Sequence, residues 1–386
     1  MRKPARLHRL FIGTSLLLAC SGEIEPAITK DSLVDGGANN DADSARDGSA
    51  GNDATLTSPE AGSAGNPDGR CAIPAEAREE DVSTPRTVVG DGSKASCTGS
   101  AFVAAVAKGG IITFNCGPDP VTITLDRTAK VVNDNGPKIV IDGGGKVTLS
   151  GGGKLRILYQ NTCDSAQTVT PLPHCDNQDH PQLTVQNLTF IDGNARSEEE
   201  GGGAIFARGG RLKIVNSRFF NNVCADTGQE VGGGAVRAFD QFDDKPLYVV
   251  NSTFGGETKL GNVCSNGGAL SSIGVSYSVI NSDFSYNRAI GRGANPAQAN
   301  TPGGGSGGAI YNDGGKFTLS LCGTKIQHNH ANEGGGAVFF VSNDETGSLE
   351  IRDSTLTDNK SDKFETLPGI FVIAKDEPLI ERSTVE

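Results

Sequence analysis

The chain of 386 residues has no tryptophan, one methionine and five tyrosines, and aromatic residues make up 5% of it. Tryptophan and tyrosine are the side chains that combine a broad apolar face with a polar group at binding surfaces. Their shortage weakens a carbohydrate-binding function. It does not exclude one, because a long cleft can bind sugars through hydrogen bonds alone.

Positive charge is also in short supply, with 34 Lys and Arg against 46 Asp and Glu and a net charge of -12. Nucleic acids are bound through basic patches, so this composition argues against a nucleic-acid partner. Half of the acidic excess lies in residues 31–70, which hold eight acidic and two basic residues, a net charge of -6.

Long apolar runs are scarce, and the one at residues 10–18 is too short to span a bilayer. It follows the basic residues Arg2, Lys3, Arg6 and Arg9. This order of charge and apolar residues predicts a secretory signal peptide over residues 1–19.

The end of that peptide, Leu17-Leu18-Ala19-Cys20, resembles a bacterial lipobox. The resemblance implies cleavage before Cys20 and lipidation of its thiol, and Ser21 after the cysteine then favours the outer membrane. We therefore expect an outer-membrane lipoprotein that is exposed at the cell surface and anchored to the membrane by its lipid. The simpler alternative is that Cys20 follows a conventional signal peptide with a small-residue cleavage site.

Residues 20–70 lack a periodic apolar pattern and are rich in Gly, Ala, Ser, Asn and Asp. Such a composition predicts a disordered, acidic tether, with a mean reach of about 40 Å for some 50 residues. The folded domain is expected over residues 71–386.

Glycine is abundant, with 53 residues, and ten of them belong to one recurring phrase. Gly-Gly-Ala followed by Ile, Val or Leu occurs five times between Gly202 and Val338, at spacings of 31, 34, 40 and 28 residues. Irregular periods of this size are typical of solenoid coils whose surface loops differ in length.

A second phrase, typified by Asn281-Ser282-Asp283-Phe284, follows each copy, and apolar residues stand two and four positions before its Asn. Between them stands a mostly polar column, so a period-two strand precedes every Asn. The inward columns are Val185, Ile214, Val249, Val279, Leu321, Ile351 and Leu183, Leu212, Leu247, Tyr277, Leu319, Leu349; the outward column is Thr184, Lys213, Tyr248, Ser278, Ser320, Glu350.

Residues that recur once per coil can stack on their equivalents in neighbouring coils, about 4.8 Å apart. We expect an internal aromatic stack of Phe190, Phe219, Phe254 and Phe284. We also expect an amide ladder that satisfies turns, formed by Asn187, Asn216, Asn251 and Asn281.

The combination of Gly-Gly-Ala-Ile with Phe-x-x-Asn resembles the repeats of the polymorphic outer membrane protein family, over residues 183–359. The resemblance implies an all-β fold, a right-handed parallel β-helix of the pectate-lyase-like superfold. Phe-x-x-Asn is complete at Phe219 and Phe284 and degenerate at Ile326 and Leu356, but it fails after Phe254, where Glu257 occupies the Asn position.

An N-terminal helical cap is predicted in front of the repeats. Thr98 can cap a helix over residues 100–107 that Gly109-Gly110 ends, and this helix would cover the open end of the solenoid. Strands are predicted at 111–115, 121–125, 138–141, 146–149 and 155–159, and the repeat phrases return at 369–372 and 382–385.

Eight cysteines remain after Cys20, an even number that favours disulfides in an exported chain. The expected pairs, from their positions around the cap helix, a polar loop and two repeat turns, are Cys97 with Cys116, Cys163 with Cys175, and Cys224 with Cys264. Cys71 and Cys322 are left over, and we do not expect them to pair.

The loop between Cys163 and Cys175 also offers His174, Asp176, Asp179 and His180 as metal ligands. Their spacing matches no zinc pattern, and a polar loop held by a disulfide is the simpler interpretation. No metal site and no cofactor is predicted.

An enzyme on such a fold would show clustered carboxylates in one outward column, yet the predicted outward column contains a single acid, Glu350. The pair that remains is Asp243 and Asp244, with Arg237 nearby in sequence. The alternative for these residues is the solvated charge of a surface loop.

Two functions follow from these features. The first is a surface-anchored, non-catalytic lipoprotein that displays a rigid β-helix for adhesion or structural contact with an unknown protein or polysaccharide. The second is an anchored polysaccharide lyase or glycoside hydrolase, which would use calcium. For either, the insertions at residues 225–231 and 292–306 are natural places for a binding face.

Overall fold

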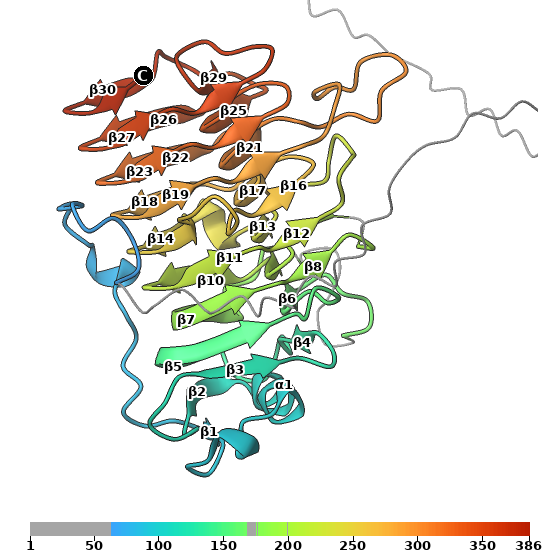
Figure 1. Ribbon diagram of the computed structural model, residues 1–386, viewed down its shortest axis with the longest axis vertical. Coiled ribbons are helices and arrows are strands. Elements are labelled where there is room, and N and C mark those ends of the chain that lie inside the picture. Colours follow the sequence, from blue (N-terminus) through green and yellow to red (C-terminus); the bar gives the residue numbers. More distant parts are fainter. Residues whose placement is uncertain (1–62, 168–174, 176, 199) are drawn as a thin grey trace, which may run out of the picture. The chain divides into compact units, whose positions relative to one another are not determined.

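The computed structural model describes residues 63–167, 175, 177–198 and 200–386. In this part the protein is mostly β, and its strands form three long parallel sheets, named A, B and C below (Figure 1). The signal peptide, Cys20 and the tether up to residue 62 lie outside the described residues. Among the described helices, none has the length and apolar character needed to cross a membrane.

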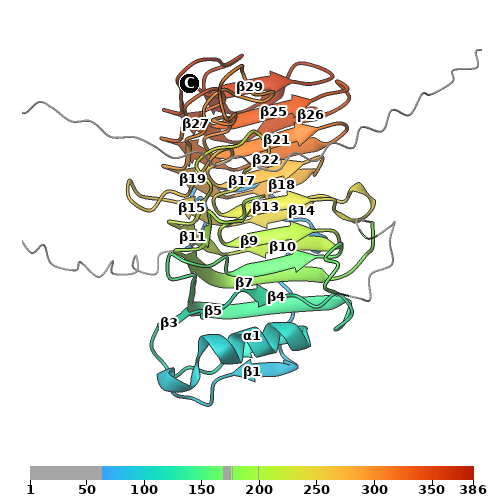
Figure 2. The same ribbon diagram turned by 90° about the vertical axis from the view of Figure 1, so that its right-hand side faces the viewer.

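The chain visits the sheets in a fixed order. From β9 in sheet B it passes through β10 and β11 in sheet A and β12 in sheet C, and then returns to sheet B at β13. Each passage is one coil, and its strands pair in parallel with those of the next coil. Sheets A, B and C therefore all run along one stack of coils (Figure 2).

Sheet A contains β1 (Thr87–Val89), β2 (Gly110–Phe114), β3 (Val121–Thr124), β5 (Lys138–Ser150), β7 (Gln182–Ile191), β10 (Arg211–Val215), β11 (Arg218–Phe220), β14 (Leu247–Val250), β15 (Thr253–Gly255), β18 (Tyr277–Ile280), β19 (Asp283–Ser285), β22 (Thr318–Cys322), β23 (Lys325–Gln327), β26 (Ser348–Arg352), β27 (Thr355–Thr357), β30 (Leu379–Glu381) and β31 (Thr384–Val385). Sheet B contains β4 (Ala129–Lys130), β6 (Leu158–Asn161), β9 (Ile205–Arg208), β13 (Val236–Phe239), β17 (Leu270–Ile273), β21 (Ile310–Gly314), β25 (Val338–Ser342) and β29 (Ile370–Ile373). Sheet C contains β8 (Asn194–Ala195), β12 (Val223–Cys224), β16 (Val263–Cys264), β20 (Arg288–Ala289), β24 (His330–Ala331) and β28 (Lys360–Ser361).

The predicted strands in front of the repeats differ from these bounds in two places. The segments expected at 138–141 and 146–149 form the single strand β5, whose register with β7 shifts between Asp142 and Val147. The strand expected at 155–159 begins instead at Leu158, because residues 151–155 form a turn closed by backbone bonds from Lys154 and Leu155 to Gly151.

The apolar columns face inward and pack in register. Leu212 pairs with Leu183, Ile214 pairs with Val185, and both columns are buried along the stack. The rings of Phe190, Phe219, Phe254 and Phe284 stack with centroids 4.8, 4.6 and 4.7 Å apart and are fully buried. Like-on-like stacking of this kind gives the coils one continuous apolar core.

The amide ladder runs through three of the four expected residues. Asn216 Nδ2 donates to Asn187 Oδ1 (3.3 Å), and Asn251 Nδ2 donates to Asn216 Oδ1 (3.1 Å). Asn281 instead bonds the backbone of Cys71, accepting from its N–H (2.9 Å) and donating to its carbonyl (3.0 Å). All four asparagines have positive φ, which fits a role in the turn.

A second ladder is buried inside the stack. Asn222 Nδ2 donates to Asn262 Oδ1 (2.9 Å), and Asn262 Nδ2 donates to Asn287 Oδ1 (2.9 Å). The series continues through Asn329 to Asn359. The ladder therefore continues past Phe254 although the sequence motif fails there: a five-residue insertion moves Glu257 into an exposed loop, and Asn262 takes the vacant place.

The cap helix α1 (Gly99–Lys108) covers the N-terminal end of the stack (Figure 2). Thr98 Oγ1 accepts a hydrogen bond from the backbone N–H of Ala101, and Gly109 with φ of 68° ends the helix. Phe102, Ala105 and Val106 are buried in the core. Three short 3-10 helices complete the helical segments described: η1 (Ala75–Ala77), η2 (Lys94–Ser96) and η3 (Phe242–Asp244).

The described residues contain four disulfides. The Cα atoms are 5.7 Å apart in Cys97–Cys116, 5.0 Å in Cys163–Cys175 and 4.7 Å in Cys224–Cys264. The expectation that Cys71 and Cys322 stay apart is wrong, because they form a fourth bridge with Cα atoms 5.9 Å apart. Its two cysteines are separated by 251 residues, so sequence proximity could not reveal it.

The bridge belongs to an N-terminal strap, defined as residues 63–80, which runs along the outside of sheet A and appears in blue in Figure 1. Residues 63–70 were assigned to the tether, yet Gly65 N–H donates to Thr253 Oγ1 (2.8 Å) and Asn66 N–H to the Asn281 carbonyl (2.9 Å). The packed part of the chain therefore starts before residue 71.

The strap covers an apolar stripe on the outside of the sheet. Val215, Val250 and Ile280 stand one position before the ladder asparagines, and Ala77 packs on them with the half-buried Cys71 and Ile73. Exposed apolar stripes are unfavourable in water, which explains why this segment lies down on the coils.

Glu80 holds the C-terminal end of the strap on sheet A. Its carboxylate pairs with Lys138 and with Lys213 (2.5 Å), and Lys213 Nζ also donates to the carbonyl of Arg78 (2.7 Å). Lys213, predicted to face solvent, is consequently buried. Thr184, predicted to face the same way, is also buried.

Candidate functional site

Asp243 and Asp244 lie on η3, in the turn between sheets B and A. Both are exposed and have positive φ, and Asp243 N–H donates to Asn177 Oδ1 (3.0 Å). They line a cavity of about 250 Å³ together with Asp240 and Lys245. Asp243, Asp244 and Lys245 are all exposed, so little excludes water from a reaction there.

Arg237 is not a partner of that pair. It lies in β13, where its side chain is 1% exposed, and its guanidinium donates to Ser271 Oγ and to the Glu230 carbonyl (2.6 Å). The guanidinium carbon sits 4.5 Å from the centroid of the Phe239 ring. Burial lowers the pKa of Arg237. Its contacts fix the first insertion to the sheet, and the sequence proximity to Asp243 was misleading.

Arg237 belongs to an outward column of sheet B that is largely aromatic. The column is continuous in register from coil to coil and consists of Tyr159, Phe206, Arg237, Ser271, Tyr311, Phe339 and Phe371. Tyr311 and Phe339 stack at 4.8 Å. Five of the seven residues in this column are aromatic. The signal was in the sequence, since each member follows the apolar residue of a Gly-Gly-Ala phrase or its equivalent.

Two insertions meet over this column. Residues 225–231 and 292–306, far apart in sequence, are joined by a bond from Gly228 N–H to the Gly303 carbonyl (3.2 Å). Ala297 N–H donates to Gln229 Oε1 (2.8 Å). Both loops are anchored to rigid strands, so their contact holds one preformed surface.

Beneath them lies a cavity of about 250 Å³, called the insertion cavity below. Its lining combines apolar side chains with carboxylates and amides. The members are Glu230, Ile273, Asn295, Pro296, Asp313, Gly314, Phe339, Val341 and Asn343.

The polar groups of the insertion cavity converge on Asn295. Its Nδ2 lies 3.0 Å from Tyr311 Oη, 3.1 Å from Asp313 Oδ2 and 3.3 Å from Glu230 Oε1. Tyr311 Oη donates to Asp313 Oδ2 (3.0 Å), and Asn343 Nδ2 donates to Asp313 Oδ1 (3.0 Å). Burial, and then the negative charge of Asp313, raise the pKa of Tyr311, so it stays a neutral donor.

A larger cavity of about 410 Å³ lies outside sheet A, between the strap and the turn after η3. Its cations are mostly engaged: Lys138 and Lys213 pair with Glu80, and Arg211 pairs with Asp179. Because these groups hold the strap and a neighbouring loop in place, we regard the cavity as part of the scaffold.

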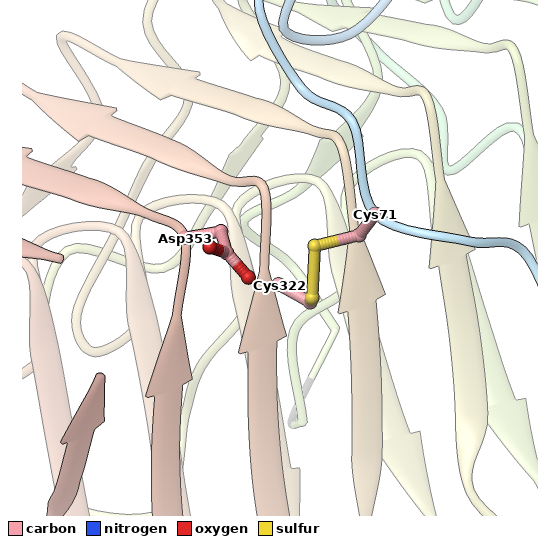
Figure 3. Close-up of side chains that lie close together, drawn as sticks. All are labelled: Cys71, Cys322 and Asp353. Carbon is pink, nitrogen blue, oxygen red and sulfur yellow. A yellow bond between two sulfur atoms is a disulfide. The ribbon is translucent and has the colours of Figure 1, made fainter. Parts of the chain in front are cut away.

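The described residues contain one group with ligand atoms close enough for a metal ion: Cys71, Cys322 and Asp353 (Figure 3). The two sulfurs form the disulfide, so they are not thiolate ligands, and Asp353 pairs with Arg382. Two of the metal ligands considered in the loop after Cys163 have other partners. Asp179 pairs with Arg211, and His180 Nε2 lies 3.5 Å from Asp134 Oδ1. His174 and Asp176 lie outside the described residues.

Comparison with known proteins gives no match to a family model, to a curated protein or to a solved structure. Arguments about function therefore rest on this chain's own geometry. The insertion cavity is the strongest candidate, because two loops, an aromatic column and converging polar groups meet there.

Proposed function

We propose that this protein is a surface-anchored, non-catalytic lipoprotein whose rigid right-handed parallel β-helix serves adhesion or structural contact, with the insertion cavity as its binding site. In this proposal Cys20 carries the lipid and anchors the chain in the outer membrane. Cys20→Ser is then expected to move the protein from the membrane fraction to the soluble fraction.

One observation carries the binding role: the two insertions that break the repeat pattern contact each other and enclose one cavity on an outward sheet face. Insertions in other turns would be tolerated separately, without a shared surface. A cavity held by loops on a rigid scaffold loses little entropy on binding, which favours recognition of an external ligand.

The strap supports the anchoring role. A chain that arrives from a membrane tether meets the coils at residues 63–71 and is joined covalently to Cys322. Tension on the tether would then be transmitted to the middle of the stack, and the N-terminal cap would be spared.

The test uses the full-length protein with its disulfides intact. The first assay measures saturable binding of the protein to intact cells. In the second assay the protein is incubated with acidic and neutral polysaccharides, with and without calcium. New reducing ends and unsaturated products are then measured. Binding without turnover is the expected result. Absence of binding to every surface tested would count against the proposal.

A second candidate is an anchored polysaccharide lyase or glycoside hydrolase. It is favoured by the approach of two carboxylates, Glu230 and Asp313, to the same Asn295 amide. Glycosidases use paired carboxyl groups. Product release that is lost in Asp313→Asn would establish this alternative in place of the first.

A further inference from the structure

We propose that the insertion cavity binds a glycan unit that carries no acidic group. The inference rests on the proposed binding role of this cavity and specifies its ligand. It is carried by the hydrogen-bonding balance, the charge and the apolar wall of the site.

The hydrogen-bonding balance calls for a ligand that donates. The Asn295 amide nitrogen has two hydrogens, yet three oxygens lie within 3.3 Å of it, on Glu230, Tyr311 and Asp313. Ionised carboxylates only accept hydrogen bonds. Acceptor capacity is therefore left over on the side that faces the cavity, and hydroxyl groups of a sugar can fill it.

The charge of the site excludes an acidic ligand. Among the described residues, no Lys, Arg or His forms an ion pair with Glu230 or Asp313. Arg237 lies behind the first insertion, where it is 1% exposed and both terminal nitrogens are engaged, by Ser271 and by the Glu230 carbonyl. A uronate or sulfate would thus meet two carboxylates with no accessible cation, in a protein of net charge -12.

The apolar wall fits the other face of a sugar ring. Ile273 projects from β17, and Phe339 and Val341 project from β25, two strands of sheet B that both pair with β21. Pro296 closes the cavity from the second insertion. A sugar ring has an apolar C–H face as well as hydroxyl groups. The apolar wall of the cavity matches the C–H face, and the amides and carboxylates match the hydroxyl groups. The volume of about 250 Å³ is below that of typical drug-sized sites, which suits one or two sugar units.

The experiment measures binding of the full-length protein to a panel of neutral oligosaccharides, built from glucose, galactose, mannose or N-acetylglucosamine, and to oligogalacturonate and sulfated oligosaccharides. We expect at least one neutral oligosaccharide to bind in calorimetry and the acidic ones to be rejected. Glu230→Gln and Asp313→Asn should each weaken that binding at least tenfold. Asp243→Asn, a matched change in the other 250 Å³ cavity, should leave it unchanged.

Folding and function are separated within the same series. Glu230 is exposed, so Glu230→Gln should keep the wild-type melting temperature and isolate the binding effect even if Asp313→Asn disturbs its buried neighbours. Preference for acidic oligosaccharides, or an equal loss in Asp243→Asn, would overturn the inference. Binding to cells with no binding to any glycan would overturn the inference and leave the proposed function standing; absence of both would remove the two together.

Discussion

At the residue scale, single side chains gain their role from the column in which they repeat. An asparagine in one coil is a polar group that must be satisfied, and in the stack it bonds the asparagine of the next coil. Buried polar groups are costly when a partner is removed, because the remaining donor or acceptor loses water without compensation. The buried ladder therefore makes each member dependent on two others.

Asn262→Ala tests that dependence. The change leaves the backbone N–H of Asn222 and the Phe219 carbonyl without their partners, so the free energy of unfolding should fall by about 2–4 kcal/mol. Glu257→Ala is the control, since Glu257 occupies the aligned sequence position but is exposed; it should change the free energy by less than about 0.5 kcal/mol. Denaturant unfolding measures both, and equal effects would contradict the assignment of Asn262 to the ladder.

Glu80 gives a prediction for pH. Burial alone raises the pKa of this carboxyl, but hydrogen bonds and charge from Lys138 and Lys213 outweigh it and hold the pKa below the usual 4.5. A carboxyl with a lowered pKa stabilises the fold above its unfolded-state pKa, and this stability is lost as the pH falls through the folded-state value. The stability difference between the wild type and Glu80→Gln should be full at neutral pH and should shrink below about pH 4.5. A difference that does not change between pH 7 and pH 3 would show that the ion pairs of Glu80 contribute nothing.

At the element scale, the strap is the segment whose structure depends on the coils of sheet A that it packs against. It has a single short 3-10 helix, η1, and its contacts are an apolar stripe, an ion-paired carboxylate and one disulfide. Neither propensity nor periodicity specifies such a segment. Its position follows from what the coils leave uncovered.

Replacing both cysteines of the strap, Cys71→Ser with Cys322→Ser, should lower the free energy of unfolding by about 2–5 kcal/mol, because the bridge closes a very long loop. The strap should also become accessible to protease between residues 63 and 80, while the coils stay resistant. The double variant Cys163→Ser with Cys175→Ser is the control. It removes a disulfide that does not involve the strap and whose cysteines are 12 residues apart in sequence. A strap that resists protease equally in both variants would mean that its apolar contacts suffice.

At the scale of the whole molecule, the two ends of the stack differ. The N-terminal end is closed by α1, whereas β29, β30 and β31 form the last described coil. Ile380 in that coil is 38% exposed, whereas its register partner in the preceding coil, Ile351, is fully buried. In a stack, each coil is stabilised chiefly by its neighbours.

Hydrogen exchange should therefore be graded along the molecule. We expect the fastest exchange of strand amides in β29 to β31, which lack a following coil among the described residues, and the slowest in β14 to β19. Mass spectrometry of peptides from each coil measures this order. Uniform protection from one end to the other would show that the stack opens only as a single unit.

The coil could be predicted from the sequence: strand positions, inward columns and the phenylalanine stack follow from a local period, because equivalent residues of successive coils must lie side by side. Three of the four disulfides were also predictable, since their cysteines flank one helix, one loop or two equivalent turns. In each case the relevant partner is fixed by the repeat or by short separation along the chain.

Contacts that have no period became visible only in the folded chain. Cys71 reaches Cys322 because the strap follows an apolar stripe across several coils, and Asn262 replaces Glu257 because a loop absorbs five residues. Arg237 lies under an insertion and away from Asp243, because its strand β13 ends at Phe239 and Asp243 belongs to η3 in the turn that follows. The insertion cavity depends on two loops that meet in space, and the shape of a loop is set by its contacts and has no repeat from which it could be predicted.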